Sequence, residues 1–320
     1  MTNLTRERCG LLALAILLTN SIGARAGESR SRELEVGGGT IDVTISGRAP
    51  VPDEALLRWV ETCARAVTTY LGRYPVPRVR LSIRAGGGGG IRHGVTYGGR
   101  VPSIRISVGR ETTDEELRED WTLTHEMVHL SFPDLTSDDS WAEEGLATYV
   151  EPLARARLGL IREADVWSGL MDGLPQGLPG GAGLHGTSDW GRTYWGGALF
   201  WFLADIEIRE KTDNRRGLPD ALAGILAAGG SIRVDWSLRE TLAAGDRAVG
   251  LTVLSDLYRR LGEEPGKVDL DETWRRLGVR RTRGEITYDD AAVLAATRRG
   301  VVEQGGAASR PPGPPSRSPK

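Results

Sequence analysis

The chain has 320 residues, of which 39% are hydrophobic and 26% charged, proportions typical of a folded globular protein. That length allows one large domain or two modest ones. Its 41 basic and 43 acidic residues give a formal net charge of −2, so the composition lacks the basic excess of a nucleic-acid-binding protein.

Residues 1–26 have the pattern of a secretory signal peptide. Arg6 and Arg8 precede an apolar run at 10–18, which is too short to span a bilayer. Ala24-Arg25-Ala26 then provides a cleavage site of the small-x-small type. We therefore expect an exported protein, secreted or periplasmic, with no stable membrane span after cleavage. An uncleaved anchor is the alternative.

The next part of the chain predicts a small α+β layer. Residues 27–39 are polar and glycine-rich and are expected to form a linker, and Cys63, the one cysteine after the signal segment, is expected to be a buried thiol in a helix. An edge strand of this layer is a hypothetical pairing site for an extended peptide. The expected elements are strands at 40–46, 79–83, 91–97 and 101–108, the last two paired across Gly98-Gly99, and a helix at 53–71.

Residues 113–132 are predicted to form one long helix. Thr113 and Glu116 have the spacing of a capping box, and Pro133 is expected to end the helix. Its apolar residues, Trp121 among them, predict wide burial.

This helix carries His125-Glu126-Met127-Val128-His129. The two histidines are four residues apart, so they lie on one face of a helix, where both imidazoles can bind one cation. Glu126 projects beside them and can hold a water on that cation. A pattern this short also occurs by chance on solvated helices, so its meaning depends on further ligands.

A catalytic zinc site needs a third protein ligand and one open position for water. Residues 140–158 predict a second helix that offers Glu143 and Glu144. Ser140 and Glu143 fit a capping box, which gives Glu143 a structural role and leaves Glu144 as the ligand. The alternative is that both acids only stabilise the positive end of the helix.

The two stretches together, His125–His129 and the run Trp-Ala-Glu-Glu-Gly-Leu-Ala-Thr-Tyr-Val-Glu at 141–151, resemble the gluzincin metallopeptidases. The likeness is to their aminopeptidase-type branch and to the loosely defined peptidase MA-like domains. It implies a zincin-like α+β fold, with a small mixed sheet and helices packed on a metal-binding helix, followed by a mostly helical C-terminal layer. It also implies Zn²⁺ as cofactor, with His125, His129 and Glu144 as ligands and Glu126 as general base.

The same resemblance assigns two further residues. Glu151, seven residues after Glu144, would be an acid that orients a histidine ligand; its alternative is a solvated helix charge. Residues 194–198 resemble the Tyr-x-Lys-Gly-Ala segment whose tyrosine stabilises the oxyanion, which implies that role for Tyr194. A packed aromatic is the alternative reading of Tyr194. Gly196 replaces the lysine, and Gly196-Gly197 predicts close helix packing near the metal.

Two features depart from that family. The connector between the second histidine and Glu144 has fourteen residues, 130–143, and is shorter than usual there. The Gly-x-Met-Glu-Asn segment that binds a peptide amino terminus is not recognisable, and Gly94–Gly99 occupies its approximate place. The resemblance therefore does not extend to exopeptidase specificity.

The rest of the chain predicts helices without recognisable chemistry. His185, in a glycine- and proline-rich loop at 172–188, is expected at the surface, with a transition-state donor role as the lesser alternative. Residues 303–320 are predicted to be disordered. The expected helices span 189–210, 218–228, 236–243, 247–261, 271–277 and 288–299.

The sequence thus predicts an N-terminal α+β subdomain at 40–132 and a helical subdomain at 133–302 that supplies the third ligand. Their function would be that of a secreted zinc metallopeptidase with a peptide or protein substrate and no nucleic-acid partner. One alternative is a non-catalytic zinc-containing module that binds peptides or cell-wall material. The other is a membrane-anchored partner protein with an accidental pentapeptide and no metal.

Overall fold

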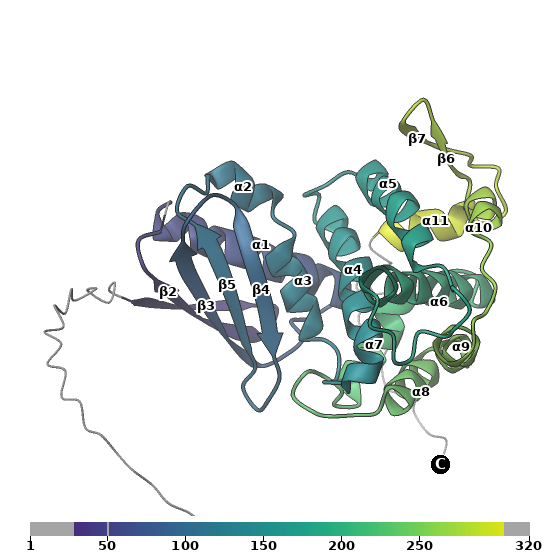
Figure 1. Cartoon of the computed structure of the whole chain (residues 1–320), viewed down its shortest axis with the longest axis horizontal. Helices are drawn as coiled ribbons and strands as arrows, with labels where there is room; N and C mark the ends of the chain where they lie inside the picture. The colour runs from purple at the N-terminus through teal and green to yellow at the C-terminus, as the bar shows by residue number, and fades with distance from the viewer. Residues whose placement is uncertain (1–28, 50, 304–320) are drawn as a thin grey trace, which may run out of the picture.

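The computed structural model describes residues 29–49 and 51–303. A β-sheet with its covering helices forms one side of the molecule, and a larger group of helices forms the other (Figure 1). The expected signal peptide at 1–26 lies outside the described residues, as does the expected disordered tail apart from its first residue. Within the described ranges, no helix has the length and apolar character that a bilayer span requires.

The sheet has five strands in the order β1-β2-β3-β5-β4. β2, β3 and β5 are parallel to one another, whereas β1 and β4 are antiparallel edge strands. The pairing of β4 with β5 confirms the hairpin expected across Gly98-Gly99. β4 is the edge strand that lies beside the helical side (Figure 1). The strands are β1 (Arg30–Val36), β2 (Gly39–Ser46), β3 (Arg78–Gly86), β4 (Ile91–Tyr97) and β5 (Ser103–Gly109).

Alternation of apolar and polar residues explains which face of this sheet is buried. In a strand, every second side chain points to the same face. The apolar set lies against helix α1 (Asp53–Leu71), in which Cys63 is buried as expected. α1 also contacts α3 and α4, so it connects the sheet to the site described below. The buried strand residues are Ile41, Val43, Ile45, Val79, Leu81, Ile83, Ile104, Ile106 and Val108.

The expected linker at 27–39 is wrong over Arg30–Val36, which forms strand β1. This strand lies at the sheet edge and most of its side chains are exposed, so its sequence lacks the apolar alternation of a half-buried strand. Arg30 fixes its start by donating two hydrogen bonds to the carboxylate of Asp53, at 2.6 and 2.9 Å. The edge strand is therefore held by tertiary contacts that its own pattern does not reveal.

The long helix expected at 113–132 is two helices, α2 (Asp114–Glu119) and α3 (Thr122–His129). Asp120 separates them with an extended backbone. Its carboxylate accepts hydrogen bonds from the amides of Thr122 at 3.0 Å and Leu123 at 3.1 Å. Aspartate competes with helical hydrogen bonds in this way and favours helix starts over helix interiors. The histidine-bearing helix thus begins afresh, one turn before its first histidine.

The other side of the molecule is helical, as predicted, and its two central helices, α4 and α6, contact each other. The structure adds a hairpin, β6 (Val279–Thr282) with β7 (Glu285–Tyr288), which the sequence pattern did not predict. It lies at the end of the helical side (Figure 1), where Arg281 donates a hydrogen bond to Asp172 at 2.6 Å. The helices are α4 (Ser140–Arg157), α5 (Glu163–Gly173), α6 (Gly197–Lys211), α7 (Leu218–Ala227), α8 (Leu238–Val249), α9 (Val253–Leu257), α10 (Leu270–Leu277) and α11 (Ala295–Val302). Short 3-10 turns occur at Ser137–Asp139 and Leu174–Gly177, and π-helical turns at Arg192–Gly196 and Tyr258–Glu263.

Candidate metal centre and substrate cleft

Helices α3 and α4 bring His125, His129 and Glu144 together. Glu144 Oε2 lies 3.3 Å from His125 Nε2 and 3.5 Å from His129 Nε2. Potential ligand atoms of the three side chains all lie within 4.8 Å of one another. The convergence expected from sequence spacing is therefore present in the fold.

The two distances from Glu144 to the histidines fit a tetrahedral zinc ion. Ligand atoms bound about 2.0–2.2 Å from a tetrahedral zinc lie roughly 3.3–3.6 Å apart. The two carboxylate–imidazole separations, 3.3 and 3.5 Å, fall in that interval and are long for a charge-assisted hydrogen bond. Two nitrogens and one oxygen are also the donor set of many catalytic zinc sites, which keep the fourth position for water.

The charges of the three groups suit ligation as well. Burial favours the neutral form of Glu144, but hydrogen bonds and positive charge from both histidines outweigh it and hold the pKa of this carboxyl well below its usual range. Burial lowers the pKa of His125. For His129, burial acts in the same direction, but the contact with Glu144 prevails and the pKa is raised. An ionised carboxylate and a neutral imidazole are the forms that bind a metal, so a metal bound by His129 would compete with its proton.

Glu143 does not take part in the group, and its contact differs from the one expected. Ser140 donates to the carbonyl of Ser137 at 2.9 Å instead of capping α4, so the expected capping box is absent. Glu143 Oε1 accepts a hydrogen bond from the amide of Leu135 at 2.7 Å. This carboxylate therefore anchors the short connector between α3 and α4, and burial raises its pKa to about 7.

Strand β4 positions Glu126. The hydroxyl of Thr96 donates to Glu126 Oε2 at 2.7 Å and to its carbonyl at 2.9 Å. Gly94 gives the carboxylate its space, because a Cβ there would lie 2.7 Å from Glu126 Cγ and 2.9 Å from its Oε1. The sequence did not predict that Thr96 contacts Glu126. The one indication that residues 94–99 matter was their position, which is approximately that of the Gly-x-Met-Glu-Asn segment of the gluzincins.

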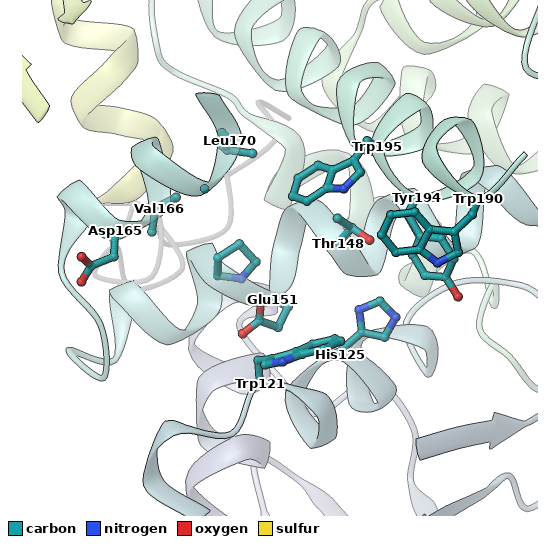
Figure 2. A pocket seen from close by; sticks show the side chains of 12 residues that line it. Trp121, His125, Thr148, Glu151, Asp165, Val166, Leu170, Trp190, Tyr194 and Trp195 are labelled. Atoms are coloured by element: carbon teal, nitrogen blue, oxygen red, sulfur yellow. The ribbon is translucent and has the colours of Figure 1, made fainter. Parts of the chain in front are cut away.

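Tyr194 reaches the site from a third element, the π-helical turn that precedes α6. Its ring is stacked at 6.4 Å from the ring of His125 and at 5.2 Å from that of Trp190 (Figure 2). Burial, the negative charge of Glu144 and a hydrogen bond to it, and the charge of Glu126 raise the pKa of Tyr194 to about 12. The phenol is therefore protonated at neutral pH and able to donate. π turns occur often at functional sites, since they change the direction of one side chain.

Glu151 and His185 make contacts other than those considered from the sequence. Glu151 accepts from Arg155 Nη1 at 2.9 Å, and no described contact joins it to a histidine, so the structure does not show the expected orienting bond. With 8% of its surface exposed it is not a solvated charge either. His185 is exposed and pairs with Asp139 at 2.9 Å, outside both cavities described next.

Two cavities meet at the candidate metal group. A polar cleft of about 680 Å³ follows β4 and contains His129, Glu126 and Glu144. A second cavity of about 460 Å³ is walled mainly by aromatic and aliphatic side chains (Figure 2). Trp121, His125 and Tyr194 line both. Trp121 was expected to be buried in a continuous helix, but it lies at the helix break and is 54% exposed.

Comparison with known proteins finds solved structures with a similar fold. No protein-family model and no curated protein matches the sequence. Among solved structures, an aminopeptidase N family protein from Idiomarina loihiensis superposes with a TM-score of 0.62 at 15% identity, over 79% of this chain and 50% of that one. An M1 zinc metallopeptidase from Deinococcus radiodurans gives a TM-score of 0.47 at 18% identity, over 75% and 54% of the two chains.

The chain therefore has the fold of the aminopeptidase N family protein, and the expected zincin-like α+β fold class is confirmed. The resemblance to the gluzincin metallopeptidases, inferred from the histidine and glutamate motifs, is confirmed at the level of the fold. The chain spans about half the length of the solved structures that it matches.

Proposed function

We propose that this protein is a zinc metallopeptidase. The observation that carries the proposal is the convergence of His125, His129 and Glu144, with Glu144 at 3.3 and 3.5 Å from the two imidazoles and the carboxylate of Glu126 beside them in a cleft. Zn²⁺ bound by these three side chains would polarise the scissile carbonyl and lower the pKa of a water molecule toward neutrality.

The remaining work of the reaction would fall to side chains of the cleft. Glu126 would accept the proton of the attacking water and deliver it to the leaving amine. Thr96 would hold the Glu126 carboxylate in one orientation through the 2.7 Å hydrogen bond. Tyr194, protonated at neutral pH, would donate a hydrogen bond to the oxyanion, a contact that strengthens as charge develops on that oxygen.

The substrate would be an extended peptide laid along β4. This strand is the sheet edge nearest to the metal group, and its residues Ile91–Tyr97 line the polar cleft. An edge strand offers backbone donors and acceptors to an incoming chain without regard to its side chains. We further propose that the protein is exported and that residues 1–26 direct it there, on the signal-peptide pattern alone.

The principal test compares metal content and turnover in single variants of the full chain. Glu144→Gln should lose most of its zinc, whereas Glu126→Gln should keep zinc and fold while cleavage of a peptide library falls by a factor of a hundred or more. Loss of zinc from Glu126→Gln would make Glu126 structural and contradict the assigned role.

A chelator should abolish cleavage by the wild-type protein, and added zinc should restore it. The competing function is a zinc-containing module that binds peptide or cell-wall material without cutting it. Glu126, held beside the metal group by Thr96 and Gly94, favours the enzyme, because a metal used only for binding needs no such carboxylate. Zinc binding without cleavage of any peptide in the library would decide for the binding module.

A further inference from the structure

We propose that the 460 Å³ aromatic cavity is the specificity pocket of this site, and that it takes a bulky apolar side chain, aromatic or long aliphatic, from a residue next to the scissile bond. This inference rests on the proposed peptidase function. It adds the class of substrate that the site selects.

The location of the cavity is the first argument. It shares Trp121, His125 and Tyr194 with the polar cleft, so it opens at the candidate metal group itself. A peptide lying along β4 would have its scissile carbonyl there. A side chain one residue from that carbonyl then has direct access to the cavity.

The exposed tryptophans are the second argument. Trp121 is 54% exposed and Trp190 is 63% exposed, although exposure of large apolar side chains on a soluble surface is unfavourable. Both belong to the wall of this one cavity. Figure 2 shows Trp121 on one side of the pocket, Trp190 beside Tyr194 on another, and Trp195 above them in the view. A bulky apolar side chain would cover this surface, and aromatic rings contribute further through offset or edge-to-face stacking.

The charges in the wall favour an apolar occupant over a cationic one. Two carboxylates lie in the wall, and each already has an arginine partner. Glu151 pairs with Arg155 at 2.9 Å, and Asp165 accepts hydrogen bonds from Arg162 at 2.5 and 3.1 Å. The rest of the deep wall includes Val166 and Leu170. An incoming lysine or arginine would thus lose water without gaining an unpaired carboxylate.

The size of the cavity agrees with this occupant. At about 460 Å³ it lies in the range of pockets that enclose small ligands, and a small side chain such as alanine would leave it largely filled with water. Discrimination against small residues should therefore come from apolar area alone, which commonly amounts to about ten- to two-hundredfold in kcat/KM.

Gly169 of α5 provides a clean way to close the cavity. It is an exposed helical position in the cavity wall, and a Cβ built there meets no heavy atom within 4 Å. A larger side chain can therefore begin at this position of the wall without a clash at its Cβ. Gly169→Ala is the matched control, because it makes the same backbone change and adds only one methyl group.

The experiment measures kcat/KM on pairs of internally quenched peptides that differ at one position beside the cleaved bond, with phenylalanine or leucine against alanine or serine. Wild type and Gly169→Ala should prefer the bulky member by about tenfold or more. Gly169→Phe should reduce that ratio to near unity, because kcat/KM should fall far more for the bulky peptide than for the small one. Gly169→Leu places a smaller side chain at the same position, so its bulky-to-small ratio of kcat/KM should lie between those of Gly169→Ala and Gly169→Phe.

A binding measurement separates this inference from the proposed function. Saturation of the zinc-loaded protein with N-acetylphenylalaninamide is followed by ligand-observed NMR, with N-acetylalaninamide as the comparison. Saturable binding of the aromatic amide that Gly169→Phe removes supports the pocket even where no peptide is cleaved, in which case only the peptidase proposal fails. Cleavage with a bulky-to-small ratio that Gly169→Phe leaves unchanged overturns the pocket assignment and leaves the peptidase proposal intact.

Discussion

Gly145 of α4 lies directly against Gly197 of α6, backbone to backbone. A Cβ on Gly145 would overlap the main chain of Gly197, and a Cβ on Gly197 would overlap the carbonyl of Trp141. The close packing expected from Gly196-Gly197 is thus present, and it joins the helix that carries Glu144 to the helix that follows Tyr194. The residue after the candidate ligand is glycine because a second helix occupies the place of a side chain.

Alanine at Gly145 or Gly197 should therefore destabilise the protein, although alanine favours a helix by up to about 1 kcal/mol over glycine. We expect a net loss of about 1–3 kcal/mol in the free energy of unfolding from overpacking, together with weaker zinc binding. Urea denaturation and zinc titration measure the two effects. Gly169→Ala, at an open helical position, is the control and should be neutral or stabilising. An equally neutral Gly145→Ala would show that the two helices can separate at no cost.

Turnover should depend on the two residues of β4 that hold Glu126. Gly94→Ala would displace the Glu126 side chain, and Thr96→Val would remove its 2.7 Å hydrogen bond. Since small misplacements of catalytic groups cost up to about a hundredfold, each variant should lower kcat by about ten- to a hundredfold. Zinc content, measured by mass spectrometry of the metal, should stay at the wild-type level. Thr44→Val is the matched control on β2, since among the described residues the Thr44 hydroxyl has one hydrogen-bond partner, the exposed Ser31.

Stability should also depend on Asp120, whose carboxylate binds the first backbone amides of α3. Asp120→Ala removes the acceptor of two backbone amides and of Trp59 Nε1, at 3.0, 3.1 and 3.2 Å. Buried donors left without a partner cost about 1–3 kcal/mol, so we expect a loss of that size in thermal or urea unfolding. The capping box of Thr113 with Glu116, predicted from the sequence and present at the exposed start of α2, gives the comparison. Thr113→Ala should cost about 1 kcal/mol or less, and equal losses in the two variants would contradict a special role for Asp120.

Glu151 should make the stability of the metal-free protein depend on pH. Burial raises its pKa to about 7 in spite of the adjacent Arg155. A carboxyl whose pKa is higher in the folded than in the unfolded chain stabilises the fold fully below the unfolded pKa of about 4.5, and this contribution is lost as pH rises through about 7. Relative to Glu151→Gln, the free energy of unfolding of the wild type should fall by up to about 3 kcal/mol between pH 4.5 and 7. Above pH 7 the difference between the two proteins should stay constant. Urea unfolding of both proteins from pH 4.5 to 8.5 tests this, and a pH-independent difference would mean that Glu151 is ionised throughout.

Parts of this protein follow from local sequence. His125 and His129 share a face because a helix turns every 3.6 residues, and Thr113 with Glu116 caps α2 because the two ends of a capping box are only three positions apart. The alternation of apolar and polar residues in Ile41–Ile45 and in the strands at 79–83 and 101–108 predicts which face of the sheet is buried. Each of these features depends on neighbours within one or two turns of chain.

Other features depend on residues distant in sequence, and only the fold decides them. Thr96 reaches Glu126 across thirty residues of chain, and the exposed edge strand β1 is held by the contact of Arg30 with Asp53. Trp121 is exposed because Asp120 ends one helix before the next begins. Side-chain patterns record the period of an element, whereas the partner that each polar group finds depends on how the elements pack. The motif could therefore indicate a metal site, while the placement of Glu126, the partner of Glu151 and the aromatic pocket came from the tertiary structure.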